Sequence, residues 1–488
     1  MSAILVTLAV MPFVVSVVAW RSPVWLGKAL TVASGVASFA LCLVLVGFLG
    51  SHRTLDAGPW LSVDALSTVF LLATSFLYAA TAMFAVGYLH LPAGPDGERY
   101  GRRFLAGLNL FSWSLVIAPL VNGLALLWVA IEVTTIVSAL LVAIDDTDGA
   151  TEAAWKYVLL ASLGLGIALF ATIFLYYAGS TVYGSAYNLS YVKLLSAAGR
   201  FPPDVMRLAF VLGVLGYGTK MGLVPMHTWL PDAHSEAPTP ISALLSGSLL
   251  TTSFYAILRF MQIAQRTLGP AFPHDVLLVF GVASLALAAL YVLSQRDLKR
   301  LLAYSSIEHM CILAIGTSFG VAIALVGVLL HVLAHAAAKG TAFFGAGSLL
   351  RKFRTKDLSR IRGGISLLPW SGPMLVLAVL GLSAMPPFGT FRSEFLIVRG
   401  GLASSSYGAA AVLVILVTVA FLGLSWYTTQ AMTTATSPGS ELPRGETSLW
   451  IVASMVLGIA ALVVLGVHVP GQLSHLLTRA AGELGGTR

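Results

Sequence analysis

The sequence predicts an all-α polytopic membrane protein with about 14 transmembrane helices, ten of which form two five-helix repeats. Three observations support this fold class. Of the 488 residues, 58% are hydrophobic and only 10% are charged, whereas soluble domains carry about 25% charged residues. Apolar runs of about 20 residues, long enough to cross a bilayer, recur along the chain. Two of these runs contain prolines beside an ionisable residue, at matching places in two halves, which is typical of internally repeated transporters.

Fourteen spans are expected, and each is an apolar segment bounded by polar or turn-forming residues. They cover residues 2–20, 24–49, 62–91, 104–121, 122–144, 154–178, 206–226, 238–262, 274–293, 301–317, 321–349, 367–398, 406–432 and 447–467. The junction near Pro119 to Gly123 requires a very tight turn between two helices. The corresponding units are residues 1–103 (helices 1–3), 104–262 (repeat one, helices 4–8), 274–432 (repeat two, helices 9–13) and 433–488 (helix 14 and tail).

Basic residues alternate between the loops. With the amino terminus outside, 14 Lys and Arg fall in cytoplasmic loops and five in outer loops, the densest cluster running from Arg351 to Arg362. The positive-inside rule therefore places both termini on the outer side of the cell membrane. This asymmetry also accounts for the net charge of +8 without nucleic-acid binding.

Some ionisable residues fall inside the expected spans, where they are costly and therefore functional candidates. Glu132 lies in the middle of the fifth span, and Lys220 lies in the seventh, just before Pro225. Proline frees a backbone carbonyl, which membrane proteins tolerate mainly where the break lines a cavity. The twelfth span is broken by Pro386 and Pro387, and Glu394 follows that break.

The eleventh span carries His331, His335 and Lys339, whose spacing of four places them on one helical stripe. Glu308 and His309 lie about two turns into the tenth span. Two histidines on one helix suit a metal or a haem, but a protein-bound metal needs three or four ligands. A hydrated stripe of titratable groups is therefore the preferred interpretation, with no metal and no cofactor.

The remaining chemistry is sparse. Cys42 and Cys311 form no CxxC motif, so no iron–sulfur cluster or structural zinc is expected. No phosphate-binding or dinucleotide fingerprint occurs, and any electron transfer must take place in another polypeptide. His227 and His234 belong to a charged cluster after Pro225. The cluster is interpreted as the turn between two broken helices, where water can reach, either as a proton entry or as a capping structure.

Three stretches resemble the Mrp-antiporter-like subunits of respiratory complex I and its relatives: "KMGLVPMHTWLPDAHSEAPTPISALLSG", "QRDLKRLLAYSSIEHM" and "PPFGTFRSEFLI". The details "TPISALLSG", "AYSSIEHM" and "PPFGTFRSEF" are most similar to the component F type of group 4 membrane-bound hydrogenases. The likeness extends from the third helix to the thirteenth.

The resemblance implies 14 helices with inverted five-helix repeats and proton translocation along a central polar axis. It assigns Glu132 and Lys220 to an input-side ion pair. His331, His335 and Lys339 fall in its connecting stretch, and Glu394 falls at its terminal position. Several relatives have Lys or His in the eighth helix where this sequence has Thr251, so water is expected to bridge Lys220 and His335.

The predicted function is that of a proton-translocating, antiporter-like subunit of a redox-driven complex, either hydrogenase-like or complex I-like. The expected partners are further antiporter-like subunits, an anchor for a quinone or hydrogenase module, a peripheral redox arm and lipid. Two alternatives stay open at this point: a sodium/proton antiporter subunit of the Mrp type, and a non-pumping scaffold that docks the redox arm.

Overall fold

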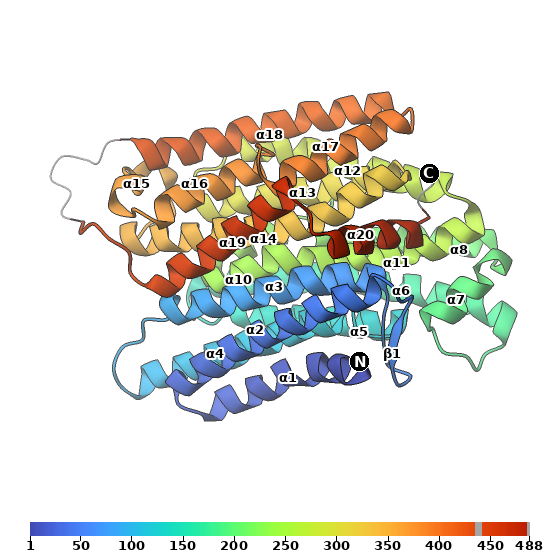
Figure 1. Ribbon diagram of the computed structural model, residues 1–488, viewed down its shortest axis with the longest axis horizontal. Coiled ribbons are helices and arrows are strands. Elements are labelled where there is room, and N and C mark those ends of the chain that lie inside the picture. Colours follow the sequence, from blue (N-terminus) through green and yellow to red (C-terminus); the bar gives the residue numbers. More distant parts are fainter. Residues whose placement is uncertain (435–441, 486–488) are drawn as a thin grey trace.

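A computed structural model describes residues 1–434 and 442–485, and these residues are mostly helical. Long helices lie side by side in a layered bundle, with α1 and α18 at opposite edges (Figure 1). Among the described residues, ten helices are long and apolar enough to cross a membrane. They are α1 (Ser2–Arg21), α2 (Val24–Leu49), α3 (Ala65–Tyr88), α5 (Leu124–Val142), α6 (Asp148–Tyr183), the helix Thr239–Leu268, α12 (Ala271–Val292), α14 (Ala322–Phe353), α18 (Tyr407–Thr433) and α19 (Leu449–Val467).

The other expected spans coincide with helices that are more polar or interrupted. These are α4 (Pro95–Ile117), α8 (Pro203–Met221), α13 (Leu298–Ser318) and the pair α16 (Ser371–Leu382) and α17 (Gly389–Ala403). Short helices complete the fold: α7 (Tyr191–Ala197), η1 (Ala198–Arg200), α9 (Trp229–Glu236), η3 (Leu358–Arg360), α15 (Gly364–Leu367) and α20 (Gly471–Glu483).

The described chain is mostly helical, as expected, and contains one small β element that the sequence did not predict. Residues before α3 form a hairpin of two short strands, β1 (Leu55–Ala57) and β2 (Leu61–Val63), paired antiparallel with Leu55 opposite Val63. Gly58, Pro59 and Trp60 make the connection, and the chain alternates apolar and polar side chains on either side of it. β2 also bonds to the α4–α5 turn, where the Ser62 amide donates to the Leu120 carbonyl at 2.9 Å.

Both predicted proline breaks are present. α8 ends at Met221, Gly222 takes a left-handed conformation, and the chain resumes as α9 at Trp229. α16 ends at Leu382, and α17 begins at Gly389, directly after Pro386 and Pro387. The residues after Pro225 that were expected to form a turn instead form α9, which packs against α6 and α13.

The helix after α9 changes its winding in the middle. It begins as α10 (Thr239–Leu244), passes through a π-helical turn, η2 (Leu245–Leu249), and continues as α11 (Leu250–Leu268). Such turns insert an extra residue and are frequent at functional sites. Every residue of η2 is buried, so the irregular backbone lies inside the bundle.

The centre of the bundle is formed by α3 and α14, whose residues are buried along most of their length. Small residues allow close helix packing elsewhere. Gly216 on α8 lies so near α6 that a Cβ there would come within 2.4 Å of the Ala168 backbone nitrogen. Peripheral helices expose apolar side chains such as Leu140 and Trp426, as expected for surfaces that face lipid.

The tight turn between α4 and α5 requires a glycine. Gly123 has a φ of +130°, and an added Cβ would approach the Leu189 carbonyl oxygen to 2.8 Å. The neighbouring Leu124 amide donates to that same carbonyl at 3.2 Å. The turn therefore sets the start of α5, the helix that carries Glu132.

Replacing Gly123 with Ala is expected to destabilise the protein by about 1–3 kcal/mol, because the new side chain must adopt a strained backbone conformation. Thermal unfolding of the purified protein in detergent measures the effect. Gly166→Ala in α6 is the matched control, since a Cβ there would meet no atom within 4 Å. Equal unfolding midpoints for the two variants would contradict the argument.

Candidate functional site

Lys220 lies at the end of α8 and is fully buried. Its Nζ donates to the Ile131 carbonyl oxygen at 3.0 Å and also to the hydroxyl of Thr135, both on α5. The ring of Tyr157 on α6 lies 5.9 Å from the ammonium. Because a buried ammonium must be compensated by hydrogen bonds, these contacts explain how α5 and α6 hold Lys220 beside the helix break.

Glu132 lies one residue after Ile131 on α5 and points toward α6. The Ser162 hydroxyl donates to its Oε1 at 3.3 Å, and its buried Oε2 has no hydrogen-bond partner within the described part of the chain. The ion pairs formed by the described residues do not include Glu132 with Lys220. Lys220 bonds to Ile131 and Thr135, which lie on either side of Glu132 along α5. The expected ion pair between Lys220 and Glu132 is absent from the part of the chain that the structure describes.

Three buried imidazoles meet between α13 and α14. His309 Nδ1 and His331 Nε2 share a hydrogen bond of 2.9 Å, and the ring centroids of His309 and His335 lie 5.0 Å apart. His331 Nδ1 bonds to the Ser393 hydroxyl of α17 at 2.9 Å. His309 was expected only as an accessory residue, yet it joins the two histidines of α14 into one cluster.

Lys339 and two carboxyl groups extend this cluster along the bundle. Lys339 is fully buried, and its Nζ donates to the Leu302 carbonyl and to the Ser305 hydroxyl, each at 2.9 Å. Glu308 on α13 is 3% exposed. Glu394 directly follows Ser393 on α17, and its buried Oε1 lacks a hydrogen-bond partner among residues 1–434 and 442–485.

The π-helical turn connects the cluster to the neighbouring helices. His335 Nε2 donates to the Ser246 carbonyl at 3.3 Å, and the Ser246 and Ser306 hydroxyls lie 2.7 Å apart. Thr251 instead donates to its own helix, at the Ser248 carbonyl 2.9 Å away. The backbone carbonyl of Ser246 therefore contacts the histidine cluster, whereas Thr251, expected to help water bridge Lys220 and His335, bonds within its own helix. The hydroxyl-rich stretch "SGSLLTTS" was the only sequence signal for the Ser246 contact.

The charged stretch after Pro225 divides into buried and exposed parts. His227 is 8% exposed and lies 6.2 Å from the Tyr291 ring. His234 is fully buried, donates from Nδ1 to the Leu230 carbonyl, and packs against Phe343 of α14. Its expected position at a hydrated turn is wrong, because α9 directs this side chain into the bundle. The carboxylates of this stretch form ion pairs nearer the surface, with Asp232–Arg300 at 2.9 Å and Glu236–Lys356 at 2.8 Å.

The histidine cluster also supplies the third metal-ligand candidate that the sequence did not reveal. His309, His331 and His335 each place one ring nitrogen within 4.8 Å of the others. Ligand atoms around tetrahedral zinc are roughly 3.3 Å apart, given zinc–nitrogen bonds of about 2.0–2.1 Å. Two of these nitrogens already bond to each other at 2.9 Å. The arrangement is therefore that of hydrogen-bonded imidazoles.

Comparisons with known proteins identify the family of this chain. The family described as NADH:quinone oxidoreductase/Mrp antiporter, transmembrane, matches residues 121–423, a range that includes every buried ionisable group described above. The chain is 38% identical over 374 residues to the hydrogenase-4 component F homolog of Methylacidiphilum infernorum, covering 74% of this chain and 76% of that protein. The predicted resemblance to the component F type is thereby confirmed.

Two further comparisons extend the likeness. Hydrogenase-4 component B of Escherichia coli is 29% identical over 348 residues, and this chain covers only 50% of its length. In the solved structure of the membrane-bound sulfane sulfur reductase, an archaeal respiratory membrane complex, one chain superposes with a TM-score of 0.85 at 21% identity. The superposition covers 99% of this chain and 98% of that chain and shows a shared fold.

The bonds of Lys220 predict how substitutions affect stability. Lys220→Met keeps the length of the side chain, and Thr135 retains a bond to the Ile131 carbonyl at 3.4 Å. The variant should therefore stay within about 1.5 kcal/mol of the wild type. Lys220→Ala should lose about 2–5 kcal/mol by leaving a cavity. Thermal unfolding in detergent compares the two, and an equal loss in both would show that the ammonium bonds hold the fold.

Proposed function

Because the chain belongs to the NADH:quinone oxidoreductase/Mrp antiporter family, we propose that its buried polar groups carry protons across the membrane within a redox-driven complex. The protein is an integral membrane protein and an antiporter-like subunit of the complex I, Mrp or hydrogenase-4 type. The observation that carries the proposal is the hydrogen-bonded series of buried groups that joins α13, α14 and α17.

The first half of the path is centred on Lys220, which holds a proton in its ammonium form. Two of its three N–H groups donate to α5, so the third can face water or the carboxylate of Glu132. A buried ammonium is stable only while bonds and counter-charge compensate it. A shift of Glu132 or of the broken end of α8 changes that compensation and releases the proton.

In the second half, the proton moves between imidazoles. A neutral imidazole has one donor and one acceptor nitrogen, so it can take a proton on one side and release another from the opposite side. His331 has a partner on each side, His309 and Ser393. His335 donates from Nε2 to the Ser246 carbonyl, which leaves Nδ1 as the acceptor. The Ser393 hydroxyl donates to the Thr390 carbonyl, so water must connect it to Glu394, which is the next residue on α17. Lys339 is bonded directly to Ser305.

Water must complete the connection between the two halves. Ser246 and Ser306 bond to each other beside His335, but no hydrogen bond links them to Lys220 in the described residues. A hydroxyl can donate and accept at once, so this pair can order a short chain of water. Thr251 lies nearby in the following turn and contributes a polar surface without carrying the charge.

We also propose 14 spans in two inverted repeats, residues 104–262 and 274–432. The supporting observation is that equivalent neighbours pack in both halves: α6 packs against α8 in the first, and α14 packs against α17 in the second. In each case a long helix faces a helix that adjoins a proline break: α8 ends before Pro225, and α17 begins after Pro387. The positive-inside rule then places both termini outside the cell membrane, although residues 435–441 and 486–488 of the C-terminal unit lie outside the described residues.

The proposed partners follow from this role. The part of the chain that the structure describes offers no CxxC motif or cluster of cysteines, and both Cys42 and Cys311 are free and buried. Electrons therefore flow through other polypeptides: a peripheral redox arm and a membrane anchor for a quinone or hydrogenase module. Further antiporter-like subunits are expected beside this one.

A sodium/proton antiporter subunit of the Mrp type is a second candidate. It is favoured by the partnerless Oε2 of Glu132 and the hydroxyl of Ser162 beside it, since a hard cation prefers oxygen ligands. Uptake into inverted vesicles separates the two functions: proton movement that persists without sodium supports the first, and strict sodium dependence supports the second.

Lys220→Met and Glu132→Gln are each expected to lower proton pumping by the intact complex roughly tenfold or more, because each removes a group that holds or steers the proton. Pumping is measured by quenching of a pH-sensitive dye in inverted vesicles, alongside the redox rate. The matched controls are Lys193→Met and Glu152→Gln, both at exposed positions. Normal pumping in both test variants would leave the protein as a docking scaffold.

His309→Gln should also reduce pumping, because an amide cannot relay a proton between His331 and its neighbours. The same dye assay measures it, with the exposed His475→Gln of α20 as control. His309 lies on α13, outside the stripe of His331, His335 and Lys339. A strong loss of pumping in His309→Gln would therefore establish the cluster of three histidines as part of the path. Wild-type pumping by His309→Gln would confine the path to α14.

A further inference from the structure

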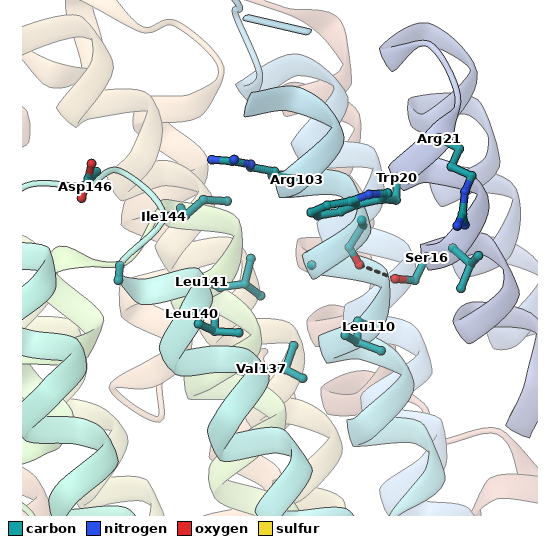
Figure 2. A pocket seen from close by; sticks show the side chains of 14 residues that line it. Ser16, Trp20, Arg21, Arg103, Leu110, Val137, Leu140, Leu141, Ile144 and Asp146 are labelled. Carbon is teal, nitrogen blue, oxygen red and sulfur yellow. Dashed lines mark hydrogen bonds between the residues drawn. The ribbon is translucent and has the colours of Figure 1, made fainter. Parts of the chain in front are cut away.

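We propose that a groove between α1, α4 and α5 binds the headgroup and one acyl chain of an acidic phospholipid. The groove has a volume of about 670 Å³ and lies on the side of the bundle formed by the first helices. Figure 2 shows its two parts: Arg21 and Arg103 at one end, together with one carboxylate, Asp146, and apolar side chains from α4 and α5 along the rest.

The charged end is built by the contact between α1 and α4. The Ser16 hydroxyl donates to the Ala106 carbonyl at 2.7 Å, which fixes the relative height of the two helices. Arg21 lies five residues after Ser16 on α1, and Arg103 lies three residues before Ala106 on α4. Since the two helices run in opposite directions here, both arginines reach the same end of the groove (Figure 2).

Both of these arginines are available for an external anion. They are exposed, and the ion pairs recorded for residues 1–434 and 442–485 include neither Arg21 nor Arg103. By contrast, the nearby Arg102 pairs with Glu98 at 3.6 Å. A second hollow of about 740 Å³ shares Trp20 and Arg103 with the groove and is also lined by Glu98, Arg99 and Arg102. Because Arg99 pairs with Asp96 and Arg102 with Glu98, the charge left for an anion at this end is that of Arg21 and Arg103.

The rest of the groove suits a hydrocarbon chain. Its walls include Val17, Leu110, Val137 and Leu140, and Leu140 is 70% exposed, so the groove opens sideways toward the bilayer. Trp20, 56% exposed, lies at the charged end, and tryptophan is typical of the headgroup level of a membrane. Basic side chains at that level attract anionic lipids. Charge and apolar lining therefore agree on an acidic phospholipid, in preference to a zwitterionic one.

The test uses the purified full chain in detergent, titrated with phosphatidylglycerol or with phosphatidylcholine while thermal unfolding is followed. A ligand that binds only the folded state raises the unfolding midpoint. Wild-type protein should respond to phosphatidylglycerol far more than to phosphatidylcholine. The double variant Arg21→Gln/Arg103→Gln should bind phosphatidylglycerol roughly 25-fold more weakly, about fivefold for each arginine.

Two further variants test whether the change in lipid binding is specific to the groove. Arg200→Gln/Arg399→Gln removes the same charge at exposed positions elsewhere and should behave as wild type. Leu140→Trp fills the apolar part without changing charge and should also weaken the response. Equal responses to the two lipids, or equal weakening in both arginine double variants, would overturn the proposal. The proposal would also be overturned if the groove variants no longer associated with the complex but kept their response to lipid. That result would assign the groove to a neighbouring subunit.

Discussion

The absence of water in the bilayer interior is the constraint on which this structure depends. Every backbone polar group there must find its partner within the protein, and a buried charge is costly unless it is hydrogen-bonded. Lys220 and Lys339 are fully buried. Lys220 bonds to a carbonyl and a hydroxyl of α5, and Lys339 bonds to a carbonyl and a hydroxyl of α13. Lys220 therefore ties the end of α8 to α5 beside the first proline break, and Lys339 ties α14 to α13.

The sequence predicted what depends on local pattern. The apolar runs gave the positions of the helices, and the prolines gave the interruptions of α8 and of α16–α17, since both effects act within a few residues. The stripe of His331, His335 and Lys339 follows from helical periodicity alone. The short hairpin before α3 and the short helix α9 were missed because neither is long enough to produce a distinct periodic pattern.

Contacts between helices were much less accessible to prediction. Spacing places a residue on a face of its own helix, but the rotation of that helix against its neighbours depends on packing over the whole bundle. For this reason the sequence could not show that His309 meets His331, that Ser246 contacts His335, or that Glu132 turns toward Ser162. The resemblance to a known family identified most of the ionisable groups, and the hydroxyl residues that connect them required the structure.

The hydrogen bonds between imidazoles and serines have a consequence for directionality. Each group in the series from His309 through His331 to Ser393 can both donate and accept, so the whole row can reverse its polarity by rotating hydroxyls and exchanging tautomers. On the proposed function, such a row passes protons equally well in either direction. The direction of net transport then depends on changes in charge outside the row, at Lys220, Lys339 or Glu394. The direction in which the proposed path moves protons is therefore set by the complex to which this subunit belongs.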